Sequence, residues 1–288
     1  MDPDQTGRDP VELWDHRRLP VATIEELEQG QASRAIERQA EVMVLDGDDR
    51  LVSRAVTAFR RRHRGRERPV RYLPLRTGRF DRIAAELGAP KPSRRLAKRM
   101  LDDPERFQES TTQRRALRVV TSARPAPVWG FSVGLGLFFR LFEILQRSEG
   151  QGLSGLRSAV GELARQVTGG EGRRFEAVGA RVSVDYQAWA EQVGYLVASG
   201  LESSWLGLSL ADRVEPRWEG SESAGGLVGK VAGSAALPGF LQGGAGRAFE
   251  RIHVDGNEGF VVDGELYDPA EPHVLQVGPG HVCDFVDV

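Results

Sequence analysis

An apolar run that stops at an acidic loop and then continues as a helix is the feature that most constrains this chain. Residues 42–45, VMVL, are uninterruptedly apolar and have the length of a buried strand. The loop Asp46-Gly47-Asp48-Asp49-Arg50 follows. The segment LVSRAVTAFRRR (51–62) then places apolar side chains at 51, 52, 55, 56 and 59, which is the spacing of an α-helix. A strand, a short loop and a helix in this order favour an α/β fold.

The same pattern occurs again farther along the chain. Residues 70–73, VRYL, predict a short strand that ends at Pro74. The loop LRTGR follows, and FDRIAAELG predicts a helix that ends at Gly88. Because the carboxyl ends of parallel strands lie on one edge of a sheet, we expect the two loops to be neighbours there.

The character of the sequence changes near residue 115. Short apolar runs predict strands at 116–120, 180–184, 193–199, 251–254, 259–262, 273–277 and 281–286. Helical patches remain at 135–147 and 153–167. We therefore expect a polar arm at 1–20, an α/β domain at 21–115 and a β-rich domain at 116–288.

The composition excludes several classes of protein. With 39 Lys and Arg against 41 Asp and Glu, the net charge of −2 argues against a generic nucleic-acid binder. The single cysteine, Cys283, excludes an internal disulfide and a thiolate metal site, and it fits a reducing cytoplasm. The N-terminus lacks a signal-peptide pattern, and the most apolar stretch, 130–145, is too short and too charged to span a bilayer. We expect a soluble cytoplasmic protein that is at most peripheral to a membrane.

The loop at residues 46–50 is the first candidate site. A loop between a strand and a helix presents backbone N–H groups to anions, and glycine lets the backbone approach a phosphate closely. Only Gly47 offers that freedom here, and Asp46 and Asp49 add negative charge, which Mg²⁺ would have to offset. The alternative is that the whole loop, including Asp48 and Arg50, is a solvated turn.

The second candidate site is the loop at residues 74–79. Arg76 and Arg79 can pair with phosphates, Thr77 supplies a hydroxyl, and Gly78 permits a close approach. The alternative is an ordinary polar connection between a strand and a helix.

The third candidate site is the segment Val261–Leu266. An Asp-Gly pair after an apolar run is a strong signal for a β-hairpin, and that structural interpretation is favoured locally. The functional alternative is a pair of carboxylates, Asp263 and Glu265, one of which acts as general base toward a substrate hydroxyl.

In this order, the three loops resemble the motifs of the diacylglycerol kinase catalytic family, which includes bacterial lipid kinases and sphingosine kinases. Residues 46–50 stand where that family has Gly-Gly-Asp-Gly-Thr, and residues 74–81 where it has Pro-Leu-Gly-Thr-Gly-Asn-Asp. Asp263-Gly264-Glu265 matches the family's late Asp-Gly-Glu. Residues 23–40 are similar to the helix before the glycine loop, and residues 131–136 to the stretch that opens the second domain.

This resemblance implies an N-terminal α/β domain like that of NAD kinases and phosphofructokinases, followed by a C-terminal β-sandwich. ATP and Mg²⁺ would bind between the domains, at residues 46–50 and 76–79. The γ-phosphate would pass to a hydroxyl of diacylglycerol or a related lipid, and Asp263 or Glu265 would accept the proton. NAD kinases share the first motif, but Pro-Leu-x-Thr-Gly and the late Asp-Gly-Glu favour the lipid branch.

The sequence also departs from the family. Two glycines and the threonine of the first loop are replaced by Asp46, Asp49 and Arg50, and Arg76 and Arg79 replace a glycine and the asparagine of the second. Two hypotheses follow. The chain is an ATP-dependent lipid kinase with an altered loop, or it is a pseudokinase, a relative without catalysis that binds lipid or protein.

Overall fold

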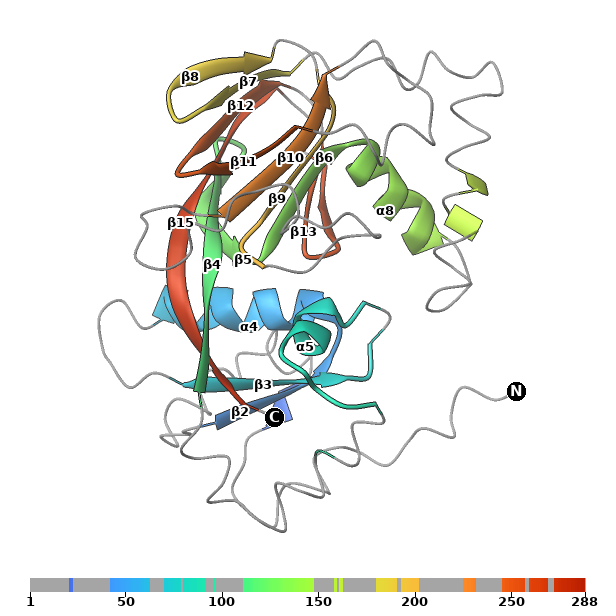
Figure 1. Cartoon of the computed structure of the whole chain (residues 1–288), viewed down its shortest axis with the longest axis vertical. Coiled ribbons are helices and arrows are strands. Elements are labelled where there is room, and N and C mark those ends of the chain that lie inside the picture. Colours follow the sequence, from blue (N-terminus) through green and yellow to red (C-terminus); the bar gives the residue numbers. More distant parts are fainter. Residues whose placement is uncertain are drawn as a thin grey trace. The chain divides into compact units, whose positions relative to one another are not determined.

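The computed structural model (Figure 1) describes residues 21–22, 42–62, 70–78, 80–91, 96, 111–147, 158–159, 161–162, 180–190, 193–201, 225–231, 245–256, 259–268 and 272–287. The predicted polar arm, the predicted helix at 23–36 and Arg79 lie outside these residues. The chain divides into two compact units: unit 1 is Met1–Arg114 with Cys283–Val288, and unit 2 is Arg115–Val282. The division falls within two long strands, β4 (Thr111–Thr121) and β15 (His273–Val286).

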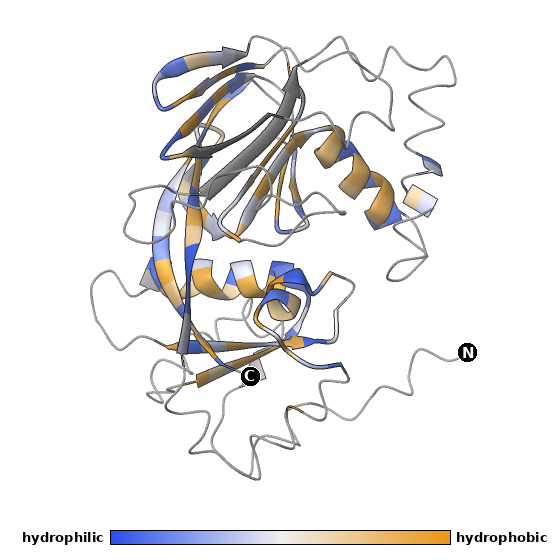
Figure 2. Ribbon diagram, in the orientation of Figure 1, coloured by the Kyte–Doolittle hydropathy of each residue, from blue (hydrophilic) through white to orange (hydrophobic). Residues whose placement is uncertain are grey.

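The described part of unit 1 is an α/β fold. Its parallel strands are β1 (Val21–Ala22), β2 (Val42–Gly47), β3 (Arg71–Arg76) and the end of β15, in that spatial order. Its helices are α4 (Asp49–Arg62) and α5 (Arg82–Glu86). The predicted strand–loop–helix alternation is confirmed, and β2 is drawn almost entirely in the hydrophobic colour in Figure 2.

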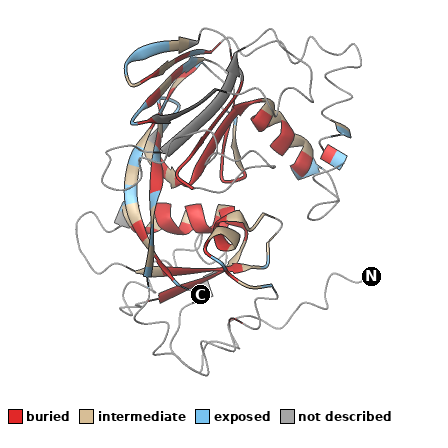
Figure 3. Cartoon of the chain, in the orientation of Figure 1, coloured by how far each residue is buried: buried red, intermediate tan, exposed pale blue. Residues whose placement is uncertain are grey.

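The two faces of this sheet are both buried. Val44 and Leu73 lie in one apolar cluster with Ala84 of α5. Side chains alternate along a strand, so Tyr72 points to the other face. There it meets Phe59 of α4, with the ring centroids 6.0 Å apart. Figure 3 shows α4 buried along most of its length, as its apolar spacing predicts.

Two expectations for unit 1 were wrong. Pro74 does not end the strand but lies inside β3, opposite Leu45. Proline lacks an N–H group, but at Pro74 the described strands pair with β3 on one side only, through β2, so the position without a donor can face the other side. The last six residues belong to unit 1 rather than to the second domain, because Phe285 pairs with Tyr72 and is fully buried.

Unit 2 contains two sheets. One has the order β11-β10-β9-β6-β13-β14, and the other continues from β15 through β12, β7 and β8, while β4 pairs with β15 and β5 pairs with β4. The remaining strand bounds are β5 Arg124–Gly130, β6 Ser132–Gly136, β7 Arg181–Val184, β8 Gln187–Ala190, β9 Val193–Ser199, β10 Gly225–Val231, β11 Ala245–Phe249, β12 Ile252–Gly256, β13 Phe260–Val262 and β14 Glu265–Tyr267.

The inner faces of both sheets form one core. Leu196 of β9 and Phe260 of β13 belong to the same buried cluster as Val182 of β7 and Leu275 of β15. Helix α8 (Leu137–Arg147) follows β6 and also contacts β9 and β13. This packing is that of a β-sandwich, so the predicted combination of an α/β domain and a sheet domain is confirmed. No helix in the described residues is long and apolar enough to cross a membrane.

Candidate functional site

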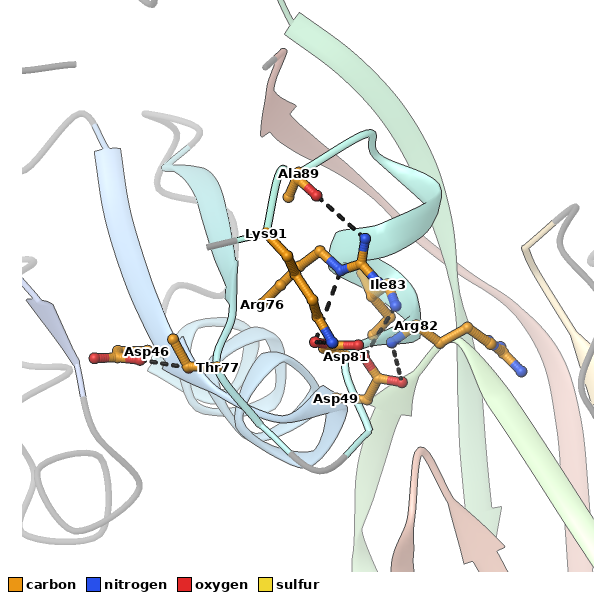
Figure 4. A network of polar contacts seen from close by, with 9 residues as sticks. All are labelled: Asp46, Asp49, Arg76, Thr77, Asp81, Arg82, Ile83, Ala89 and Lys91. Atoms are coloured by element: carbon orange, nitrogen blue, oxygen red, sulfur yellow. Dashed lines mark hydrogen bonds and ion pairs between the residues drawn. The ribbon is translucent and has the colours of Figure 1, made fainter. Parts of the chain in front are cut away.

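The loops that follow β2 and β3 lie side by side at one edge of unit 1. The two strands pair in parallel up to Gly47 and Arg76, so their carboxyl ends coincide. Just beyond this point the Thr77 hydroxyl donates a hydrogen bond of 2.5 Å to Asp46 Oδ1 (Figure 4). The predicted proximity of the two loops is therefore observed, and a carboxylate already accepts the Thr77 hydroxyl hydrogen.

Glycines let these loops approach each other. A Cβ atom on Gly78 would lie 2.5 Å from the Asp48 Cα, which no real side chain tolerates. A Cβ atom on Gly47 would lie 2.8 Å from a methyl carbon of Leu51. Gly78 is thus required by packing between the loops, independently of any ligand, whereas a side chain at Gly47 would require the Leu51 side chain to shift.

Asp48 caps helix α4. Its Oδ1 accepts the backbone N–H of Arg50 at 3.1 Å, as an N-cap residue does. Its Oδ2 lies 2.8 Å from Arg50 Nε and 2.7 Å from Arg50 Nη2. The carboxylate of Asp48 is therefore buried and neutralised by a neighbour in the chain.

Asp49 caps a different helix from its own. Its side chain is buried, and it accepts the first two amides of α5, from Arg82 at 3.1 Å and from Ile83 at 2.9 Å. Asp81, which directly precedes α5, makes no capping hydrogen bond with its side chain. The Asp49 carboxylate thus points into unit 1 and fastens the second loop to the first.

Arg76 is also held within unit 1. Its Nη1 donates to the Ala89 carbonyl at 3.5 Å, and its Nε lies 3.7 Å from Asp81 Oδ2. Lys91 Nζ lies 2.9 Å from the same oxygen. Figure 4 shows Arg76 and Lys91 converging on Asp81, while Arg82 extends away from it. Arg76 is a predicted site residue. Its positive charge lies near the carboxylate of Asp81, within unit 1.

The Asp-Gly-Glu segment forms the hairpin turn between β13 and β14. Asp263 and Gly264 both have positive φ angles, 45° and 89°, which is the geometry of a type I′ turn. The Asp263 side chain is buried and accepts two hydrogen bonds of 2.6 Å, from the Phe131 amide and the Ser132 hydroxyl. Its own amide donates to the Ser132 carbonyl at 3.1 Å. The hairpin interpretation is confirmed, and Asp263 ties the turn to β6.

Glu265 starts β14 and is half-buried. On the other side of the turn, Gln146 of α8 donates to the Gly264 carbonyl at 3.3 Å. Sequence reasoning missed Gln146 and the role of Ser132, because each lies more than a hundred residues from its partner along the chain. Among the described residues, no three His, Cys, Asp or Glu side chains gather in a way that could hold a metal ion.

Comparison with known proteins gives a result at the level of the fold. No family model matches the chain, and no curated protein matches it. A solved diacylglycerol kinase structure from Bacillus anthracis matches with a TM-score of 0.57 at 10% identity, over 93% of this chain and 83% of that one. A second structure of this kind from the same organism gives 0.59 at 13%, over 92% and 82%. The chain shares their fold.

The resemblance seen in the sequence is thereby supported at the level of the fold, which is similar to that of these diacylglycerol kinase structures. An NAD kinase from Archaeoglobus fulgidus in complex with ATP also aligns, over 93% of this chain and 92% of that one, at 12% identity. The TM-score of that alignment is 0.44.

Proposed function

We propose that this diacylglycerol kinase-like protein acts without phosphoryl transfer, as a lipid-binding module in which a carboxylate of the protein occupies the nucleotide loops. The observation that carries the proposal is the hydrogen bond from the Thr77 hydroxyl to Asp46. A phosphate in this loop would need that hydroxyl and would meet a carboxylate in its place.

The cost to a phosphate ligand follows from charge. Two like unit charges about 4 Å apart repel by about 1 kcal/mol in water and about 4 kcal/mol near a protein surface. Losing the Thr77 hydrogen bond adds about 0.5–1.5 kcal/mol. Since 1.4 kcal/mol is a factor of ten in affinity, Asp46 would weaken phosphate binding by at least about tenfold. Asp46 therefore opposes a bare phosphate, and ATP would bind here only with a Mg²⁺ ion that offsets the charge of this carboxylate.

The Asp-Gly-Glu turn supports the same proposal. A general base must lie within hydrogen-bond reach of a substrate hydroxyl. Asp263 is buried and accepts two short hydrogen bonds, from Phe131 and Ser132. The contacts of Asp263 are therefore sufficient to explain why the Asp-Gly-Glu motif is intact. Its presence is not by itself a reason to expect catalysis.

The lipid side of the proposal rests on the shared fold and on the resemblance of the sequence motifs to the lipid kinases. We propose a diacylglycerol or a related lipid as the ligand, bound by the β-rich domain of residues 116–288, with cytoplasmic location and peripheral contact with membranes.

Two measurements on the wild-type chain test this function. Sedimentation with phosphatidylcholine vesicles, with and without diacylglycerol, should show binding that depends on diacylglycerol. Radiolabelled ATP with Mg²⁺ and the same vesicles should yield no labelled lipid. Labelled lipid above the background of a boiled sample would contradict the proposal, as would an absence of binding to vesicles that contain diacylglycerol.

The second candidate function is an ATP-dependent lipid kinase. It is favoured by the tight packing of Gly47 and Gly78, which preserves the backbone path of both loops. In that case Asp48 and Arg50 would have to leave each other to hold Mg²⁺ and phosphate, together with Arg76, Thr77 and Arg79. ATP would supply the transferred phosphoryl group, and Glu265 would be the base. Transfer of label to lipid that is lost in Glu265→Ala would establish this candidate.

A further inference from the structure

We infer that Asp46 alone, among the side chains that replace loop glycines, excludes phosphate from this site. The inference rests on the proposed function and names the residue that determines it. Asp46 is half-buried and Thr77 is exposed, and their mutual hydrogen bond lies at the surface of the two loops. The carboxylate therefore sits where a ligand from solvent would arrive.

The other two side chains that replace loop glycines, Asp49 and Arg76, make contacts away from Thr77. Asp49 is buried and holds the first amides of α5, at Arg82 and Ile83. Arg76 is bound to the Ala89 carbonyl and lies near Asp81. Neither side chain bonds to Thr77 in the described residues. Their removal would loosen the packing of unit 1 without freeing the Thr77 hydroxyl.

The frame around Asp46 does not depend on it. Gly78 lies against the Asp48 backbone, Gly47 lies against Leu51, and Asp48 caps α4 through Arg50. None of these contacts involves the Asp46 side chain. Removing that side chain should therefore leave the loops in place, with the Thr77 hydroxyl released as a donor to an anion.

The test compares variants of the full chain by isothermal titration with inorganic phosphate and, separately, with Mg²⁺ and ATP. Asp46→Gly should bind at least one of the two at least tenfold more tightly than wild type. Asp46→Asn should gain less, since its amide oxygen can still accept the Thr77 hydrogen bond although the charge is gone. Adding Thr77→Val to Asp46→Gly should lower the affinity by about two- to tenfold, the share that the Thr77 hydrogen bond supplies, and leave the share that comes from removing the charge.

Asp255→Asn is the matched control. This carboxylate is exposed on β12 in unit 2, and its loss changes the net charge by the same amount. A gain in Asp255→Asn equal to that in Asp46→Gly would overturn the inference, because bulk charge would then explain it. An affinity gain that Thr77→Val leaves unchanged would also overturn it.

The outcomes separate the inference from the proposed function. Submillimolar binding of Mg²⁺ and ATP by wild type would refute both. If neither the wild type nor a folded Asp46→Gly variant binds phosphate or Mg²⁺ and ATP, the inference fails while the proposed function stands. Circular dichroism establishes that the variant is folded, and Asp46→Asn provides a second variant with nearly unchanged shape.

Discussion

Replacement of Asp263 separates a structural role for the Asp-Gly-Glu turn from a catalytic one. In the structure this carboxylate is buried and accepts the Phe131 amide and the Ser132 hydroxyl, each at 2.6 Å. Asp263→Ala would leave both donors buried without an acceptor. Asp263→Asn would keep one acceptor for the amide, and its NH₂ group can donate to the serine oxygen.

The magnitude follows from these two bonds. A hydrogen bond to a charged group contributes about 1.5–3 kcal/mol, and a buried donor left unpaired costs about 1–3 kcal/mol. We therefore expect Asp263→Ala to destabilise the protein by about 3–5 kcal/mol, and Asp263→Asn by about 1–2 kcal/mol. For a domain of this size, 1 kcal/mol corresponds to about 2–4 °C in the melting temperature.

The assay is urea denaturation followed by tryptophan fluorescence, since Trp129 and Trp189 both lie in unit 2. Asp255→Ala serves as control, because this carboxylate is exposed and its loss should change stability by less than about 0.5 kcal/mol. The reasoning is refuted if Asp263→Ala lies within about 1 kcal/mol of wild type. It is also refuted if Asp263→Asn is the more damaging of the two variants.

Other predictions follow from single contacts. Asp49→Ala removes the acceptor for two α5 amides and should cost about 1–3 kcal/mol in urea denaturation; an unchanged midpoint would contradict the cap. His273 is buried and its Nδ1 lacks a partner in the described residues, so His273→Phe should leave the melting temperature unchanged or raise it; a fall would contradict this. Burial raises the pKa of Cys283 from 9.0 to about 12, so its contribution to stability is full below pH 9 and is lost as the pH rises toward 12. In Cys283→Ala, thermal stability should therefore fall less steeply above pH 9 than in wild type, and an equal slope would contradict the assignment.

The secondary structure of unit 1 could be predicted because apolar periodicity survives in its sequence. β2 and α4 appear where the pattern places them, although α4 begins at Asp49 rather than at Leu51. β15 was predicted as two strands because Gly278-Pro279-Gly280 interrupts the apolar pattern. The strand continues through this stretch: a Cβ atom on Gly280 would lie 2.3 Å from the Ala116 carbonyl, so glycine permits close contact with β4 there.

The neighbourhood of the two loops was predictable, but the roles of their side chains were not. Strand order along the chain was enough to bring Asp46 near Thr77. Nothing in the sequence indicates that Asp49 bonds to residues 33 and 34 positions away, because that contact depends on how α5 packs. For the same reason Asp263 appeared as a candidate base, although its carboxylate lies against β6.

The binding of Mg²⁺ and ATP to the wild-type chain, measured by isothermal titration calorimetry, tests the central claim most directly. Because the Thr77 hydroxyl donates its hydrogen bond to Asp46, we predict no saturable heat of binding at millimolar ATP and no increase in melting temperature. A ligand at 100 times its Kd would stabilise the protein by about 2.7 kcal/mol, which is easily detected. Saturable binding with a submillimolar Kd would show that the loops admit the nucleotide and would contradict the account.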